Sequence, residues 1–528
     1  MTTTDLRPTM PTSPPAPPVD PRLDEPGWRP EAPSTARALF FAVVGTVGAL
    51  VYLWWLLRPS RVGHPVLYGL LVVVELFNVT QAVAFWITTA SGRLRRRRPD
   101  PLRPVSDPAV DVFVPVYDEP AAVVRPTLEA AARMRGRPQV WLLDDGCRDE
   151  MRDLAASVGV GYLRREDSTG AKAGNINHAL ARTTAPFVAV LDCDHVPHRD
   201  FLATTVPHVV APDVAFAQTP QHYANADENP VAAAAWGQQA LFFGPIAVGK
   251  DAWGSMFCCG TNVVFRRDAL ESVGGFPTES VTEDFELSVR LQEDGWRSVY
   301  VPEVLASGYG PDDMAGYVSQ QLRWARGCLS ALPRIVRSSL PFGKRVQYLL
   351  SSGFFLTGWT FLVYMSMPVL RLLTGAQPIA SQGADQFLLF FLPYFGLALA
   401  ALAATGAGAY GYDAYSLLFA NWWVHVSATI AVLRGKPGRF VVTPKGGEAR
   451  RQPRAVLPAL ACIAVLLGTA AWGLARDTSP ATINNVAFIA LHVTVLWSGA
   501  APALRRPAAR SAAAEDEHTS VAADATAA

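Results

Sequence analysis

The chain has 528 residues, 50% of them hydrophobic, with 14 tryptophans and a formal net charge of +1. This length allows about two to four domains, and the balanced charge argues against a nucleic-acid partner. The hydrophobic residues gather in segments of about 20 residues, which is the length that a membrane-spanning helix needs. The sequence therefore predicts an integral membrane protein rather than a soluble protein with buried core helices.

The N-terminal part combines a polar tail with two predicted spans. Residues 1–34 contain many prolines and few large apolar side chains, which predicts a disordered tail, and they do not begin like a cleaved signal peptide. Residues 35–92 contain apolar segments at 36–57 and 65–90, which predict two transmembrane helices. Arginines follow at 93 and 95–98. Because positive residues collect on the cytoplasmic side of a membrane, the next segment is expected in the cytoplasm.

Residues 99–335 contain no predicted span and are long enough for one soluble domain. Short apolar runs alternate there with helical stretches, which predicts an α/β domain with a mostly parallel sheet and ligands at the carboxyl ends of its strands. The predicted strands are 110–116, 139–145 and 187–194, and the predicted helices lie near 120–134, 148–158 and 173–182.

Two pairs of aspartates stand where predicted strands end. Asp192 and Asp194 follow an apolar run, and residues i and i+2 of a strand point to the same face, so both carboxylates can reach one site. Two such carboxylates repel each other unless a cation lies between them, and Mg²⁺ or Mn²⁺ suits hard oxygen ligands. A solvated strand end is the plainer interpretation of one pair. Asp144 and Asp145 end a second strand, however, and one crevice is expected to gather both pairs.

Three further motifs contain residues that could accept a proton or bind a phosphate or a sugar ring. Asp284 lies in the first turn of a helix predicted to start near Glu283. It is either part of ordinary helix capping or a carboxylate that accepts a proton from a substrate hydroxyl. In QQLRWARG at 320–327, a glutamine, an arginine and a tryptophan share one helix face. They suit a diphosphate and a flat ring, although an amphipathic interface helix has a similar pattern. Lys172, before a predicted helix, is either a phosphate contact or an exposed lysine.

The C-terminal part alternates further spans with basic segments. Residues 336–435 are expected to hold interface helices and two spans, at 347–370 and 385–405. Because the basic residues around 434–454 are expected in the cytoplasm, 414–433 is predicted to lie in the membrane interface, with a crossing as the alternative. Residues 436–454 would then form a cytoplasmic loop, 455–506 two spans at 455–475 and 483–503, and 507–528 a second disordered tail. The six cysteines have no metal-binding spacing, and reduced thiols are expected.

Ten short motifs occur in a characteristic order: PVYDEP, DDG, KAGN, DCDH, QTPQHY, FCCGT, GGF, TED, QQLRW and VTPKGG. With them the chain resembles the processive, inverting family 2 glycosyltransferases, most closely the catalytic subunits of bacterial cellulose synthases. The resemblance covers residues 105–335 densely and then 436–450. It implies a GT-A-like α/β domain with a Rossmann-like mixed sheet, placed in the cytoplasm and inserted in an α-helical bundle that spans the plasma (inner) membrane.

The resemblance also implies a role for each matching residue. Asp284 would be the general base, and Asp192 with Asp194 would hold the UDP and a Mg²⁺ or Mn²⁺ ion. The nucleotide and its phosphates would be bound by Tyr117, Glu119, Asp145, Lys172, Gln320 and Arg323. The growing polysaccharide would meet Phe257, Cys258, Gly260 and Trp324, and a gating loop would cover the donor through Phe440, Val442, Thr443 and Lys445.

The implied activity is transfer from a UDP-sugar donor, UDP-glucose first, to a β-1,4-glucan that crosses the membrane, with accessory secretion subunits as further partners. Another UDP-sugar giving a chitin- or hyaluronan-like chain, a single-sugar transferase, and a transport or scaffold protein without chemistry remain open. Asp118 stands where the family has asparagine, and two spans rather than four precede the catalytic domain. No PilZ-like barrel follows the loop, so regulation by cyclic di-GMP within the chain is not expected.

Overall fold

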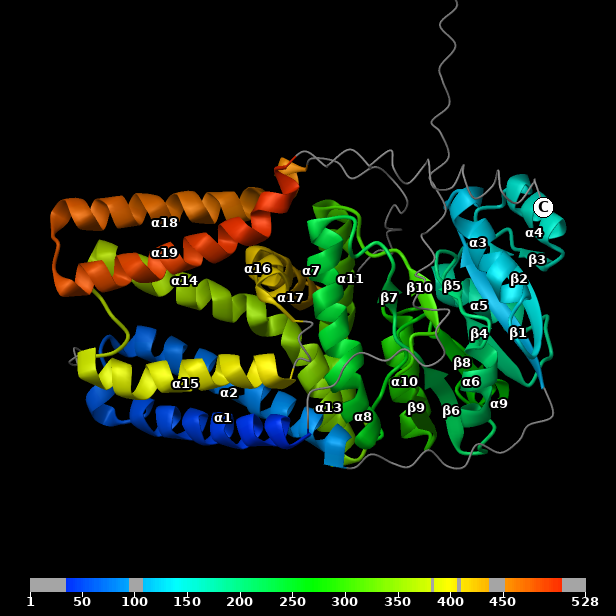
Figure 1. Cartoon of the computed structure of the whole chain (residues 1–528), viewed down its shortest axis with the longest axis horizontal. Coiled ribbons are helices and arrows are strands. Elements are labelled where there is room, and N and C mark those ends of the chain that lie inside the picture. The colour runs from blue at the N-terminus through cyan, green and yellow to red at the C-terminus, as the bar shows by residue number, and fades with distance from the viewer. Residues whose placement is uncertain (1–34, 95–107, 381–383, 406–409, 436–451, 506–528) are drawn as a thin grey trace, which may run out of the picture.

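The computed structural model of the chain describes residues 35–94, 108–380, 384–405, 410–435 and 452–505. In these residues a bundle of long helices and an α/β domain lie side by side, with α7 (Pro230–Leu241) and α11 (Met314–Ser330) standing between them (Figure 1). The bundle consists of α1 (Thr35–Leu56), α2 (Pro65–Leu94), α14 (Thr357–Thr374), α15 (Ala384–Thr405), α18 (Leu457–Arg476) and α19 (Pro480–Ala500).

The described part of the α/β domain contains a seven-stranded sheet in the order β3-β2-β1-β4-β8-β6-β9. β8 runs antiparallel to its neighbours β4 and β6, whereas the other adjacent strands are parallel. The sheet is thus the mixed, Rossmann-like sheet predicted from the sequence. Its strands are β1 (Ala109–Val116), β2 (Arg137–Asp144), β3 (Gly161–Arg164), β4 (Phe187–Val190), β6 (Val214–Gln218), β8 (Val263–Arg266) and β9 (Arg297–Tyr300).

Strand β1 illustrates why this sheet is buried on both faces. Val112 belongs to the apolar cluster on one face and Phe113 to the cluster on the other, because successive side chains of a strand point in opposite directions. A run rich in β-branched residues suits a strand that is covered on both sides. One face is covered by α3 (Ala121–Ala132), α4 (Asp149–Val158) and α6 (Phe201–Val209), the other by α5 (Ala171–Leu180), α9 (Arg267–Ser272) and α10 (Glu283–Glu293).

A smaller sheet of three short strands lies between the large sheet and α11 (Figure 1). Its order is β5-β10-β7, formed by Val196–Pro197, Ala306–Gly308 and His222–Tyr223. These strands bring segments that are distant in sequence to the carboxyl edge of the large sheet.

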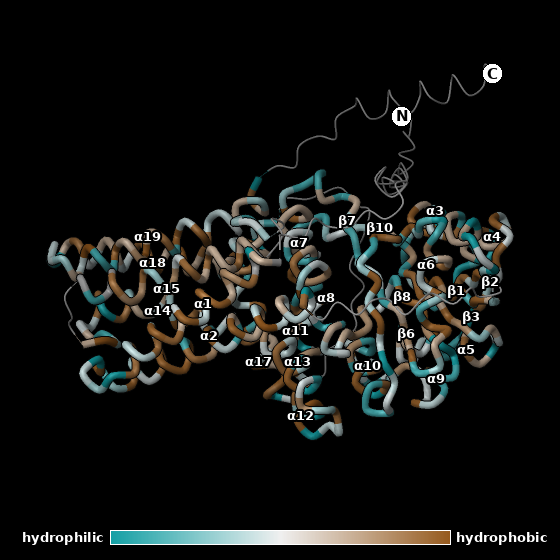
Figure 2. Tube along the Cα trace, turned by 60° about the horizontal axis from the view of Figure 1, so that its bottom comes forward, coloured by the Kyte–Doolittle hydropathy of each residue, from teal (hydrophilic) through white to brown (hydrophobic). Residues whose placement is uncertain are grey.

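Apolar side chains cover the outside of the bundle, and Figure 2 shows the hydrophobic character of its helices. Phe40 on α1, Val73 on α2 and Trp472 on α18 are all more than half exposed. Within the described residues, six helices are long and apolar enough to cross a membrane. Exposed apolar surface of this extent on helices of spanning length suits lipid rather than water. The chain is a multi-pass membrane protein.

Five of the predicted spans coincide with such helices, and two segments differ from the prediction. The predicted span 385–405 forms α15, but its apolar stretch, Leu389–Ala404, is short. Conversely, Pro230–Ala252 inside the α/β domain also has spanning length and apolarity. It is interrupted by a π-helical turn, Phe242–Ile246, in which Gly244 leaves helical geometry, so α7 and α8 (Ala247–Ala252) do not form one continuous helix.

The segment 414–433, predicted to lie in the interface, forms two helices bent by 46° to each other. These are α16 (Tyr412–Ala420) and α17 (Trp422–Leu433), of 9 and 12 residues. At a rise of about 1.5 Å per residue, neither alone spans a hydrocarbon core of about 30 Å. They lie at the end of the bundle that faces the α/β domain (Figure 1). Together the two helices are long and apolar enough for a broken span, so the interface position stays a prediction.

The turns that join α1 to α2, α14 to α15 and α18 to α19 lie at the far end of the bundle, away from the α/β domain (Figure 1). Two of these turns are bonded to each other there. Val62 forms an antiparallel bridge with Ile379, and the N–H of Gly63 donates to Pro378 O at 3.0 Å. The helical hairpin before the α/β domain and the one after it are therefore joined at their distal ends. The Val62–Ile379 bridge and its neighbouring hydrogen bond are called the staple below.

Candidate active site

A cavity of about 560 Å³ opens where β1, β2 and β4 end, between the large sheet and α11. Its wall is built from segments that are far apart in sequence, as expected at the carboxyl edge of parallel strands. Of the residues predicted for the site, Tyr117, Glu119, Asp145, Lys172, Asp192, Asp194, Gly260, Asp284, Gln320, Arg323 and Trp324 line this cavity.

Asp192 and Asp194 converge through a turn and not, as predicted, along a strand. Strand β4 ends at Val190, and the N–H of His195 donates to Asp192 O at 2.9 Å, which closes a turn at this point. The chain leaves the sheet after Leu191, whose N–H makes a last bond to the neighbouring strand. The side chain of Asp194 is fully buried, whereas that of Asp192 is 31% exposed to the cavity.

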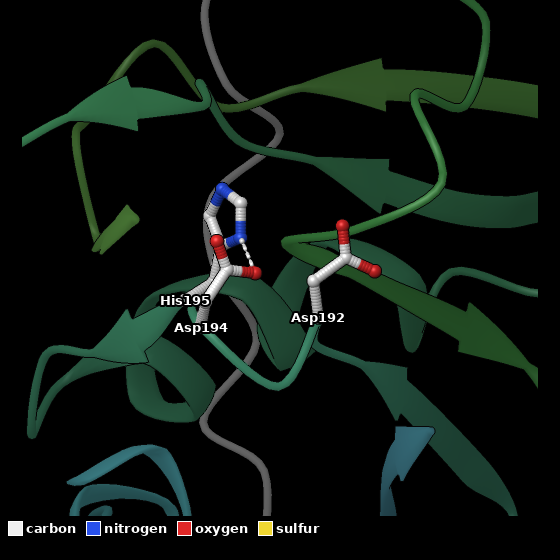
Figure 3. A group of neighbouring side chains, drawn as sticks. All are labelled: Asp192, Asp194 and His195. Atoms are coloured by element: carbon white, nitrogen blue, oxygen red, sulfur yellow. Dashed lines mark ion pairs between the residues drawn. The ribbon is translucent and has the colours of Figure 1, made fainter. Parts of the chain in front are cut away.

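His195 completes a group that could hold a metal ion. Ligand atoms of Asp192, Asp194 and His195 lie within 4.8 Å of one another, and His195 Nδ1 is 3.4 Å from Asp194 Oδ1 (Figure 3). The buried ring has no hydrogen-bond partner for either nitrogen among the described residues. It fits because Gly308 lacks a side chain: a Cβ there would lie 2.6 Å from the ring. Two carboxylates and an imidazole are a suitable donor set for a divalent cation.

Lys172 stands beside this group, in the first turn of α5. Its Nζ contacts Asp192 Oδ1 and donates to Gly260 O at 2.7 Å. Burial opposes the positive charge, but the carboxylates of Asp192, Glu283 and Asp284 outweigh it, so that the pKa of Lys172 is raised. A cation that is fixed at a helix N-terminus suits a phosphate group.

Asp284 is the second residue of α10 and is half-buried in the opposite wall of the cavity. Burial, and then the neighbouring carboxylate of Glu283, raise its pKa to about 7, against the opposing effects of the Phe285 N–H, Lys172 and Arg323. A carboxylate with such a pKa is suited to accept a proton near neutral pH. Ser288 fixes the start of the helix, because its Oγ donates to Asp284 O at 2.8 Å.

The loop 257–261 separates Asp284 from the aspartate turn. Gly260 adopts φ +81°, and a Cβ on it would lie 3.0 Å from Asp284 Oδ2. The loop is held from several sides: Cys258 N donates to Ser288 Oγ, Cys259 N to Gln218 Oε1, and Asp192 N to Thr261 Oγ1. The loop is therefore a fixed wall between the two groups of carboxylates.

Helix α11 contributes the third side of the cavity through Gln320, Arg323 and Trp324, as their shared helix face predicts. Asp313 caps the helix by accepting from Gly316 N at 2.8 Å. Gly327, which ends QQLRWARG, allows α11 to approach the segment Thr282-Glu283-Asp284, since a Cβ on Gly327 would lie 2.2 Å from Cγ2 of Thr282. Thr282 occupies the N-cap position of α10, but its side chain makes no cap hydrogen bond.

The wall of the cavity where the nucleotide is predicted to bind is formed by the loops after β1 and β2. Glu119 accepts from the N–H groups of Tyr117 and Asp118, at 2.9 and 3.2 Å, and the Tyr117 side chain is half exposed at this wall. Asp145 lines the cavity, but Arg165 donates to both of its carboxylate oxygens.

Six of the predicted site residues do not contribute to this wall. Phe257 and Cys258 belong to the layer behind Gly260. There the ring of Phe257 packs edge-on against the ring of Phe285, with 4.9 Å between the ring centroids. Their predicted contact with the acceptor therefore stays a prediction. The gating-loop residues Phe440, Val442, Thr443 and Lys445 lie outside the described residues.

Residues 187–404 match the sequence profile of the glycosyl transferase family group 2. The chain carries a family 2 glycosyltransferase domain. The cellulose synthase 1 catalytic subunit of Komagataeibacter xylinus is 31% identical over 432 residues, which are 78% of this chain and 58% of that protein. The cellulose synthase catalytic subunit of Pseudomonas fluorescens is 30% identical over 442 residues, 80% of this chain and 59% of that protein. The chain thus spans less than two thirds of the length of these relatives.

The fold of the glycosyltransferase domain also has a solved counterpart. A mannosyltransferase from Pyrobaculum calidifontis, in complex with GDP-Man and Mn²⁺, superimposes with a TM-score of 0.52 at 18% identity, over 70% of this chain and 99% of that one. At this identity the match supports the GT-A-like fold alone.

Two residues in or beside the cavity, His195 and Arg165, were not predicted from the sequence. His195 directly follows the aspartate pair in DCDH, so its position in the motif was a usable signal. Arg165 lies seven residues before Lys172 and has no motif that marks it; only the fold brings it to Asp145.

Proposed function

We propose that the chain is a membrane-embedded inverting glycosyltransferase that extends a β-linked polysaccharide, a β-1,4-glucan from UDP-glucose in the simplest case, and passes it across the plasma membrane. The observation that carries this proposal is the position of Asp284. Its carboxylate faces the cavity across Gly260 from Lys172 and the aspartate group. The relatives named as UDP-forming cellulose synthases support the choice of donor and product.

The mechanism follows from the charges around the cavity. Asp284 takes the proton from the terminal hydroxyl of the acceptor, which attacks the anomeric carbon from the face opposite the diphosphate. Lys172 and Arg323 stabilise the negative charge that develops on the leaving diphosphate. A Mg²⁺ or Mn²⁺ ion held by Asp192, Asp194 and His195 would supply further positive charge to the same group. Inversion results because base and diphosphate lie on opposite sides of the reacting carbon.

The acceptor is expected to leave the cavity toward the bundle. Trp324 offers a flat face for a sugar ring, and α11, which carries it, packs against α17 at the end of the bundle. The catalytic domain would be cytoplasmic, because Arg93, Lys344 and Arg454 belong to segments at the domain end of the bundle, where the positive-inside rule places the cytoplasm.

One experiment tests the donor, the product and the catalytic assignment together. Membranes that contain the protein are incubated with a panel of labelled UDP-sugars and Mg²⁺ or Mn²⁺, and the product is digested with linkage-specific hydrolases. A glucan that only a β-1,4-glucanase degrades, absent with Asp284→Asn, is the expected result. Incorporation of N-acetylglucosamine would instead indicate a chitin- or hyaluronan-like synthase, addition of one sugar a non-processive transferase, and no incorporation at all a protein without this chemistry.

A further inference from the structure

Arg165 does not line the cavity and yet connects two parts of the site. It is the first residue after β3, and its side chain is 9% exposed, beside an Asp145 side chain that is 5% exposed. Nε and Nη2 donate to the two carboxylate oxygens of Asp145, the second at 2.7 Å. This is the bidentate geometry in which arginine and carboxylate fix each other's orientation.

The same guanidinium also holds the turn that leads into α5. Nη1 donates to Thr169 O and Nη2 to Ala171 O, both at 2.8 Å. That turn is unfavourable on its own, because Ala171 has φ +45° and follows Gly170 at φ +76°. Hydrogen bonds from a fixed arginine compensate for such a conformation, and Lys172 is the very next residue.

The glycine of the KAGN motif makes this arrangement possible. A Cβ on Gly174 would lie 2.6 Å from Arg165 Nη1 and 2.1 Å from Thr169 O. Only a residue without a side chain lets the guanidinium and the turn come this close to α5. The motif glycine is therefore explained by Arg165 and not by direct contact with a ligand.

We infer that Arg165 is a positioning residue: by clamping Asp145 and the turn 166–171, it sets the place from which Lys172 meets the diphosphate of the donor. The inference rests on the proposed function and extends it. It also assigns to Asp145 a second task besides contact with the nucleotide, since both of its carboxylate oxygens accept from Arg165.

The test compares Arg165→Met and Arg165→Lys with Arg164→Met in the full-length protein in nanodiscs. Arg164 is the matched control, because it is the adjacent arginine, is 44% exposed and pairs with Asp149 outside the cavity. Hydrogen–deuterium exchange without nucleotide reports on the turn 166–172, and UDP binding with Mn²⁺ together with KM and kcat reports on the site.

We expect Arg165→Met to raise exchange in 166–172, while exchange in the sheet stays as in wild type, and to weaken UDP binding and raise KM by about tenfold, on the scale that a mispositioned binding group costs. Arg165→Lys keeps the positive charge but loses the bidentate geometry of the guanidinium. Its UDP affinity and KM should therefore lie between those of Arg165→Met and the wild type. Asp145→Asn combined with Arg165→Met should bind UDP no more weakly than the worse single variant.

Unchanged exchange and unchanged UDP affinity in Arg165→Met would overturn the inference, as would an equal effect of Arg164→Met. If the wild-type protein binds no uridine nucleotide, the proposed function fails, and the exchange of 166–172 still decides whether Arg165 holds the turn.

Discussion

Gly260 makes room for the side chain of Asp284: a Cβ on this glycine would lie 3.0 Å from Asp284 Oδ2 and 3.8 Å from Lys172 Nζ. The backbone of the loop thus passes directly between the proposed base and the proposed phosphate-binding lysine. Any side chain at this position would push one of the two away from the reacting atoms.

Gly260→Ala should therefore reduce transfer far more than it reduces stability. Its control is Gly274→Ala, because Gly274 has nearly the same φ, +80° against +81°, but nothing within 4 Å of a Cβ. Both variants lose about 1–2 kcal/mol of stability to left-handed backbone strain. Only Gly260→Ala also displaces Asp284, and a displacement of about 1 Å can reduce the rate about 100-fold. Thermal unfolding and UDP release measure the two effects. Equal rates in both variants would contradict the close approach.

Asp284→Asn should abolish most transfer and leave donor binding intact. Removing a general base typically costs about 10²–10⁴-fold in rate, while an asparagine keeps the shape of the side chain. Asp294→Asn, at the other end of α10 and hydrogen-bonded to Ser272 at 3.0 Å, is the control. Labelled-sugar incorporation and UDP affinity should then separate catalysis from binding; a variant that still makes polymer at the wild-type rate would refute the assignment.

The pH dependence of transfer should report the ionisation of Asp284. Its pKa is raised to about 7, so below that pH the carboxyl is protonated and cannot accept the acceptor's proton. We expect kcat/KM to rise with pH and to level off above about 7. Glu283→Gln removes a neighbouring negative charge that raises this pKa, so the rise should move to lower pH. An acid limb near the ordinary value of a free aspartate would contradict the prediction.

Metal dependence should follow the group at the end of β4. Chelation should stop transfer, and added Mn²⁺ or Mg²⁺ should restore it. Asp194→Asn and His195→Ala should each raise the half-saturating metal concentration by about tenfold or more. Asp200→Asn is the control, because Asp200 pairs with Arg135 at 2.8 Å outside the group. If His195→Ala titrates with metal as wild type does, the imidazole is no ligand.

The sequence predicted those parts of the fold that depend on local pattern. β1, β2 and the helices α3, α4 and α5 lie within a few residues of their predicted positions, because β-branched runs and the stretches between them have the right lengths. The helix at Asp284 begins at Glu283, as its composition predicts. Eleven of the residues that the motifs predicted line one cavity.

The remainder depends on contacts that no local pattern contains. β4 stops at Val190 because the chain turns at Asp192, although the apolar run continues in the sequence. Phe257 lies behind the cavity wall because an aromatic partner, Phe285, draws it into the layer below. The pairing of Arg165 with Asp145 joins the residues that directly follow the neighbouring strands β3 and β2, and that neighbourhood follows only from the order of strands in the sheet.

The staple between Val62 and Ile379 imposes an order on biogenesis. Its two halves are separated by the whole glycosyltransferase domain, so the ribosome must finish that domain before the first hairpin can acquire its partner. The aromatic side chains of α1 that pack on α15 likewise gain this contact only after α15 has been made. Membrane assembly of this protein is thereby coupled to synthesis of its α/β domain, and a polypeptide truncated before α14 would leave that first hairpin without the bridge to Ile379.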